Sequence, residues 1–183
     1  VTKIDNFIPA NYRYLNAKFE CRELLGWDKK LIKKKIIYFS GSITNKRKGF
    51  DFLLKSLEEL DDRFKSLFAI QILGNNKNTI SKLEELGINY YCLGYFSDEV
   101  SQVIAYNAAD ALVCPSNFDN SPNVIAEAQM CGLPVITLNG SGCSEMIKNN
   151  LTGIIASKDD HKDLQEKIKE FLDDNIKFNN LDI

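Results

Sequence analysis

The sequence has only five cysteines and one histidine, and they are scattered along 183 residues. No C-x-x-C pair occurs, which argues against an ordinary zinc site and against a disulfide framework. No apolar run approaches the ~20 residues that a helix needs to cross a bilayer. We therefore expect a reduced, cytoplasmic protein. A lysine-rich segment over residues 29–35 leaves peripheral contact with the inner face of a membrane open, although a solvated turn is the simpler interpretation.

An excess of charge of one sign is also lacking. Lysine and arginine number 23 and the acidic residues 25, for a net charge of -2. A general nucleic-acid binder needs a basic face, so this class is excluded. The length corresponds to about one domain. The chain begins at Val1 and shows no signal-peptide pattern, so we expect it to be a piece of a longer protein.

Short apolar runs recur along the chain, each rich in β-branched or aromatic residues and bounded by Gly, Pro, Asn or Ser. Such runs are typical of strands buried on both faces, and stretches of helical periodicity separate them. The alternation predicts an α/β fold, a Rossmann-like parallel sheet of about six strands with helices on both faces. The predicted strands are Ile36–Phe39, Phe68–Leu73, Tyr90–Leu93, Ala111–Cys114, Val135–Leu138 and Gly153–Ala156.

The predicted helices are marked by apolar stripes and capping residues. One stripe covers residues 50–60 and the last covers residues 164–172. Ser97 is the predicted N-cap of a helix that has Asp98 and Glu99 in its first turn.

The alternation of strands and helices also predicts the domain boundaries. Residues 1–30 lack it and are predicted to be an interdomain lead-in segment. The Rossmann-like domain is predicted over residues 31–174, and residues 175–183 form a tail.

The loop after the first predicted strand carries cations. In an open parallel sheet, ligands bind beyond the carboxyl ends of the strands. The loop from Gly41 to Gly49 is neither G-x-G-x-x-G nor G-x-x-x-x-G-K-[ST], so a dinucleotide fingerprint and a Walker-type NTPase are not indicated. Gly41 permits close approach of the backbone to a ligand, and Arg47 and Lys48 would neutralise a diphosphate. A solvated loop is the alternative interpretation.

The loop after the Ala111–Cys114 strand predicts a phosphate site. Ser121 is a good N-cap and Pro122 a good first helical residue. The backbone N–H groups of Asn123–Ile125 would then point outward at the positive end of the helix dipole.

Two carboxylates, Asp119 and Glu127, lie near this predicted phosphate site. A carboxylate repels phosphate but accepts directed hydrogen bonds from vicinal hydroxyl groups. The combination indicates a ligand with both a diphosphate and sugar hydroxyls, unless both are ordinary capping and surface acids. No D-x-D pair occurs, so we expect no metal and no cofactor, with cations and a helix N-terminus in their place.

Several segments match, in order, the motifs of one known family. They are Gly41 with Arg47–Leu54, Ile72–Gly74, Leu93–Ser97, Tyr106–Asp110 with Val113–Ser116, and Glu127–Ile136. Together they resemble the C-terminal, donor-binding domain of family-4 retaining glycosyltransferases, which have the two-domain GT-B fold. Asp119 and Glu127 stand at the two ends of that family's E-x7-E motif.

The resemblance implies a nucleotide-diphospho-sugar as co-substrate and a role for each site residue. Arg47 and Lys48 would hold the diphosphate and Glu127 the ribose hydroxyls, and with Asp119 these are the implied catalytic residues. The loop around Gly94 would meet the base, which is uracil, guanine or adenine. The other implied substrate-binding residues are Gly41, Ser42, Tyr95, Phe96, Asn120, Ser121, Pro122, Asn123, Val124 and Ile125.

Three positions depart from the family pattern. The first acid is Asp119 rather than Glu, Ser42 stands where the family has arginine after Gly41, and a glycine pair is broken over residues 140–145. The first two departures leave the choice of sugar and the geometry of the phosphate site open.

The resemblance implies retaining transfer of a hexose-type sugar to a glycan or lipid-linked acceptor, in bacterial surface polysaccharide synthesis. An N-terminal acceptor domain of the same full-length chain would be required, so we expect this part alone to bind donor weakly and to be inactive. Two alternatives stay open: a sugar-nucleotide epimerase on the same fold, and a non-catalytic α/β interaction domain.

Overall fold

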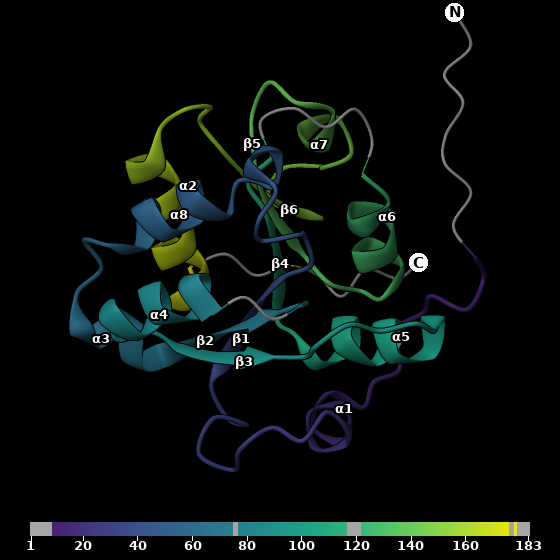
Figure 1. The fold of residues 1–183 in the computed structure, drawn as a ribbon. Helices are drawn as coiled ribbons and strands as arrows, with labels where there is room; N and C mark the ends of the chain where they lie inside the picture. The colour runs from purple at the N-terminus through teal and green to yellow at the C-terminus, as the bar shows by residue number, and fades with distance from the viewer. Residues whose placement is uncertain (1–8, 75–76, 117–121, 176–177, 179–183) are drawn as a thin grey trace, which may run out of the picture.

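The computed structural model describes residues 9–74, 77–116, 122–175 and 178. Its centre is a parallel sheet of six strands in the order β3-β2-β1-β4-β5-β6 (Figure 1). This is the strand order of a Rossmann fold, in which the topology reverses between the first and fourth strands. The strands are β1 (Lys35–Phe39), β2 (Phe68–Ile72), β3 (Asn89–Cys92), β4 (Ala111–Cys114), β5 (Val135–Leu138) and β6 (Gly153–Ala156).

Helices cover both faces of the sheet, as the alternating burial of β1 requires. Ile37 and Phe39 enter one core and Ile36 and Tyr38 the other. The first core packs against α2 (Phe50–Leu57), α3 (Asp62–Leu67), α4 (Lys77–Glu85) and α8 (His161–Leu172). The second core packs against α5 (Glu99–Ala108), α6 (Asn123–Met130) and α7 (Gly142–Glu145), and α1 (Lys18–Leu24) packs against α5. The predicted fold class is confirmed.

The predicted strands are confirmed to within one residue at each end. The predicted start of α5 is wrong by one residue. Asp98, not Ser97, is the N-cap, because its carboxylate accepts a 2.8 Å hydrogen bond from the backbone N–H of Ser101.

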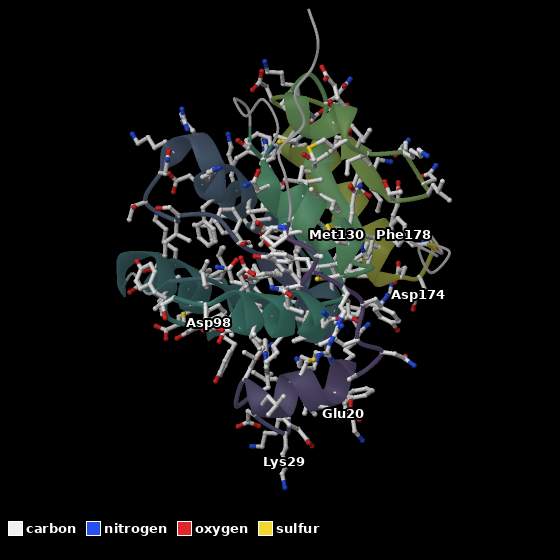
Figure 2. All side chains as sticks on the ribbon, turned by 90° about the vertical axis from the view of Figure 1, so that its right-hand side faces the viewer. Glu20, Lys29, Asp98, Met130, Asp174 and Phe178 are labelled. Atoms are coloured by element: carbon white, nitrogen blue, oxygen red, sulfur yellow. The ribbon has the colours of Figure 1, made fainter. Side chains whose placement is uncertain are left out.

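The predicted lead-in segment supplies part of the second core. Tyr12 and Trp27 are buried, and α1 packs against the outer side of α5, away from the sheet, with Lys29 at the far end of the molecule (Figures 1 and 2). The described part of residues 1–30 is therefore attached to the domain along much of its length. The boundary at residue 30 stays a prediction, and most of the predicted tail lies outside the described residues.

A buried arginine fastens α1 to the sheet. Arg22 is 2% exposed and donates to the carbonyls of Ala108 and Ile32 at 2.7 and 2.6 Å. It also pairs with the Asp110 carboxylate at 2.6 Å. Lys18 of α1 pairs with the same carboxylate at 2.6 Å. Asp110 in turn accepts from the backbone N–H of Ile36 at 2.7 Å, so two ion pairs join α1 to the start of β1.

Part of the lysine-rich segment makes contacts within the chain. Lys34 donates to the Ser66 carbonyl at 2.7 Å, and Lys35 donates to the Phe171 carbonyl at 2.8 Å. Across the described parts of the chain, no helix has the length and apolarity needed to span a bilayer.

Candidate functional site

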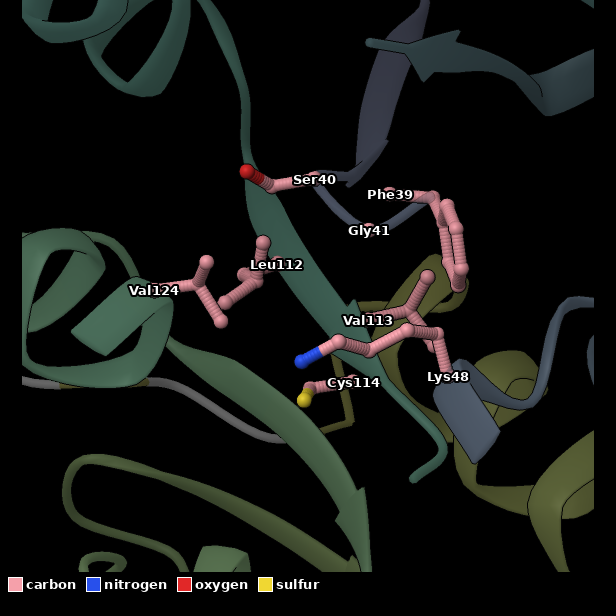
Figure 3. Close-up of a pocket in the computed structure, with 8 residues that line it drawn as sticks. All are labelled: Phe39, Ser40, Gly41, Lys48, Leu112, Val113, Cys114 and Val124. Atoms are coloured by element: carbon pink, nitrogen blue, oxygen red, sulfur yellow. The ribbon is translucent and has the colours of Figure 1, made fainter. Parts of the chain in front are cut away.

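A pocket lies at the carboxyl ends of β1 and β4, where the sheet topology reverses (Figure 3). This is the position at which open α/β sheets bind ligands. Its walls come from β1 and the residues after it, from β4, from the cationic turn Lys46–Lys48 and from the start of α6. The lining residues are Phe39, Ser40, Gly41, Lys48, Leu112, Val113, Cys114 and Val124.

The cationic loop forms a single 3-10 turn, Lys46–Lys48, capped at both ends. The Asn45 side chain accepts from the backbone N–H of Arg47 at 3.1 Å. Gly49 follows with a φ of 78°, in the left-handed region that favours glycine. The Lys48 side chain is half-buried and extends over the pocket (Figure 3), whereas the Arg47 side chain is exposed.

This turn is docked on the loop that follows β4. The buried Ser116 hydroxyl donates to the carbonyl of Arg47 at 2.8 Å. Gly49 lies so close to the same loop that a β-carbon placed on it would be 2.0 Å from the Pro115 carbonyl oxygen. The loops after β1 and β4, which were both predicted to bind phosphate groups, are therefore packed closely against each other.

Gly41 gives the cationic turn its close fit against β1. A β-carbon on Gly41 would lie 3.1 Å from the Phe39 ring and 3.2 Å from the Lys48 β-carbon. Ser42 is exposed, and its hydroxyl lies 3.2 Å from that of Thr44.

Helix α6 begins one residue later than predicted. Pro122 is its N-cap and Asn123 its first helical residue. The backbone N–H of Ile125 donates to the Pro122 carbonyl at 3.0 Å, so this group is not directed toward a ligand as predicted. Val124 lines the pocket. The predicted site residues Asp119, Asn120 and Ser121 lie outside the described residues.

Glu127 lies one turn further along α6 and connects to the mouth of the pocket through a tyrosine. Its Oε2 atom accepts a 2.7 Å hydrogen bond from the Tyr106 hydroxyl. That hydroxyl is also 3.3 Å from the Oγ atom of Ser40, which lines the pocket. Burial raises the pKa of Glu127 above its ordinary value, the Tyr106 hydrogen bond acts in the opposite direction, and Glu99 raises it further.

Sequence reasoning missed the role of Tyr106. Its position could have indicated this role: Tyr106 lies three residues after Val103 on the same helix, so its hydroxyl is on the buried face. A buried tyrosine hydroxyl usually finds a hydrogen-bond partner, and here the partners are the two polar side chains at the pocket.

The predicted base-binding loop follows β3, at the same edge of the sheet but two strands from β1. The backbone N–H of Gly74 donates to the carbonyl of Gly94 at 2.5 Å. Tyr95 is 83% exposed, and its ring covers Gly74, where a β-carbon would lie 3.2 Å from the ring. Phe96 packs against the second core. The pocket between β1 and β4 is not lined by Gly94, Tyr95 or Phe96.

Side chains that ligate metals do not gather in the described part of the chain, which contains no group of three His, Cys, Asp or Glu placed to bind a metal ion. Lys48 lines the pocket, and Glu127 is connected to the lining residue Ser40 through the Tyr106 hydroxyl.

Curated relatives include two glycosyltransferases and a protein of a cps region. An uncharacterized 41.2 kDa protein in the cps region of Klebsiella pneumoniae is 31% identical over 77% of this chain and 37% of its own length. The capsular polysaccharide biosynthesis glycosyltransferase CapM of Staphylococcus aureus is 30% identical over 66% and 34%. A D-inositol 3-phosphate glycosyltransferase of Corynebacterium jeikeium is 28% identical over 95% and 42%. The chain thus spans well under half the length of these relatives.

Solved glycosyltransferase structures share the fold. WaaG, a glycosyltransferase involved in lipopolysaccharide biosynthesis, superposes with a TM-score of 0.77 at 21% identity, over 92% of this chain and 46% of its own. Anabaena HepE in complex with UDP and glucose gives a TM-score of 0.70 at 18% identity, over 90% and 45%. The family model described as glycosyl transferases group 1 matches residues 27–182. Because that match covers most of the sequence, the chain belongs to the glycosyl transferases group 1 family.

Proposed function

We propose that the chain is the donor-binding part of a retaining, metal-independent hexosyltransferase that takes its sugar from a nucleotide diphosphate. The observation that carries the proposal is the pocket at the β1–β4 reversal, lined by the Lys48 side chain and connected to Glu127 through Tyr106 and Ser40. A cation in the pocket and a hydroxyl-accepting carboxylate connected to it suit a ligand that has both a diphosphate and sugar hydroxyls.

Lys48 has the main electrostatic role in this proposal. Departure of a nucleoside diphosphate places negative charge on the leaving oxygen, and a positioned cation stabilises that charge in the transition state. The Lys48 side chain is positioned because its turn is held by Ser116 and by the close fit of Gly49 against Pro115. Arg47, exposed on the same turn, would supply a second charge as the donor enters.

Glu127 has the recognition role. Its half-buried carboxylate would accept hydrogen bonds from the vicinal hydroxyls of the nucleotide ribose. Asp119 and Asn120 are proposed to face the transferred sugar, and Gly94 and Tyr95 to face the base, as in the family that the sequence resembles. Retention of anomeric configuration also rests on that resemblance.

The acceptor is proposed to be a glycan or a lipid-linked glycan in bacterial surface polysaccharide synthesis. Support comes from CapM and the cps-region relative, whose descriptions name capsular polysaccharide and the cps region. An N-terminal domain of the full-length enzyme would bind this acceptor, since both substrates must be held together for transfer. A cytoplasmic enzyme fits the five cysteines, none of which forms a disulfide.

Calorimetric titration of this chain with UDP, GDP and ADP tests the proposal. We expect one nucleotide to bind saturably, and Lys48→Ala to weaken it by about tenfold or more, which corresponds to about 1.4 kcal/mol. Lys55→Ala is the matched control, because it removes the same charge from the exposed side of α2. The proposal fails if no nucleotide binds to the folded chain, or if both variants bind as the wild type does.

A further inference from the structure

The hydroxyl of Tyr106 is held at a fixed place between two elements of the proposed donor site. It lies 2.7 Å from Oε2 of Glu127 on α6 and 3.3 Å from Oγ of Ser40, directly after β1. Tyr106 itself comes from α5, so three separate parts of the chain meet at one phenol oxygen.

The Tyr106 ring cannot turn away from this position without unpacking the second core. It is 1% exposed, and it makes edge-to-face contacts with Tyr12 and Tyr38 at centroid separations of 6.1 and 5.4 Å. The aromatic cluster therefore aims one polar atom at the Glu127 carboxylate.

Glu127 needs such a support more than a surface acid does. A glutamate side chain has three rotatable bonds, and it loses that freedom when it must present a carboxylate in one geometry. Tyr106 binds one of its oxygens, and a carboxylate offers about four acceptor sites. Enough acceptor capacity remains for two hydroxyls of a ligand, and the carboxylate plane is already set before the ligand arrives.

We propose that Tyr106 is a positioning residue that orients Glu127 for the ribose hydroxyls of the nucleotide and does not touch the nucleotide itself. The inference rests on the proposed function and deepens it. It predicts that the Tyr106 hydroxyl increases the affinity only for ligands that carry ribose hydroxyls.

The test compares Tyr106→Phe with the wild type by calorimetry. The probes are UDP, GDP and ADP, together with the 2′,3′-dideoxy form of whichever one binds. Tyr106→Phe is expected to weaken the ribonucleotide about tenfold, the size of one hydrogen bond to a charged group, and the dideoxy form less than about twofold. Tyr12→Phe is the matched control, because it deletes a hydroxyl from the same aromatic cluster that bonds to Gln102 and not to Glu127. It should leave both affinities unchanged.

A double-substitution cycle supplies a second readout. If Tyr106 acts through Glu127, adding Tyr106→Phe to Glu127→Ala, which leaves the Tyr106 hydroxyl no acceptor at this position, produces no further loss of ribonucleotide affinity. Equal weakening of the ribo and dideoxy forms, no weakening of either, or additive losses in the cycle would each overturn the positioning role. If none of the three nucleotides binds the wild-type chain, the proposed function itself has failed, and this inference falls with it.

Discussion

Replacing Gly49 by alanine tests whether the cationic turn is held where the site needs it. Gly49 has a φ of 78°, and an added β-carbon would stand 2.0 Å from the carbonyl oxygen of Pro115. Neither backbone group can absorb that overlap by a rotamer change. The turn that carries Arg47 and Lys48 must move away from the loop after β4, against the hydrogen bond from Ser116.

The expected loss of stability in Gly49→Ala has two parts, and a substitution at a second glycine, Gly87, separates them. Gly87 has a φ of 68°, but nothing lies within 4 Å of the β-carbon that alanine would add. Gly87→Ala should therefore show only the left-handed strain, about 1–2 kcal/mol. Gly49→Ala adds the overlap with Pro115, which at about 1–3 kcal/mol for overpacking gives a total of about 2–5 kcal/mol.

The assay is urea unfolding of the wild type and both variants, followed by nucleotide titration. Gly49→Ala should be the less stable variant and should weaken nucleotide binding, whereas Gly87→Ala should bind as the wild type does. Equal losses of stability in the two variants, or unchanged nucleotide affinity in Gly49→Ala, would refute the docking of the turn as the device that positions Lys48.

Three further substitutions, one of them with a matched control, test the electrostatics and the core. Because burial raises the pKa of Glu127 above 4.5 in the folded state, its ionisation costs stability as pH rises through that raised value. Glu127→Gln should thus gain melting temperature relative to the wild type between pH 4 and pH 7, and a constant difference would contradict this. Arg22→Met should cost about 3–5 kcal/mol in denaturant unfolding, because it breaks the pair with Asp110 and leaves the carbonyls of Ala108 and Ile32 without their donor, while Lys18 still pairs with Asp110. As its control, Arg63→Met at an exposed pair should cost at most about 1 kcal/mol. Gln71→Leu leaves the buried Trp27 indole N–H, 3.2 Å from the Gln71 amide oxygen, without its acceptor. We expect a loss of about 1–3 kcal/mol, read from tryptophan fluorescence during urea unfolding; an unchanged midpoint would show that this bond contributes nothing.

The strands were predictable because most of them are buried on both faces and therefore show as largely apolar runs, whereas β3 at the edge of the sheet is partly buried. The first residues of the helices were harder to predict, because two neighbouring residues can both be suitable N-caps. Ser97 and Asp98 are both good caps, and only the structure shows that the Asp98 carboxylate reaches the backbone N–H of Ser101.

Helix α1 escaped prediction because it buries a charged residue. Arg22 faces inward and donates to the Ala108 carbonyl and the Asp110 carboxylate, both far away in the sequence. It also donates to the nearer carbonyls of Ile32 and Lys34. A pattern-based argument assigns arginine to the solvent face, since buried charges are rare unless they are paired.

The candidate site was predictable in its residue types and not in its internal contacts. Gly41, Lys48 and Val124 were found from loop position and indeed line one pocket. The contacts that hold the pocket together join residues far apart in sequence, such as Ser116 with Arg47 and Tyr106 with Glu127. Spacing along one chain carries no information about such pairs until the strand order is known.

The most direct test of the donor pocket is an NMR titration of the isotope-labelled chain with UDP, GDP and ADP. Backbone signals should shift saturably for one nucleotide, and the shifts should gather at Phe39–Gly41, Lys48, Leu112–Cys114 and Val124, around the reversal between β1 and β4. Shifts that gather elsewhere, such as between α1 and α5, or the absence of any saturable shift, would contradict the assignment of this pocket to a nucleotide-sugar donor.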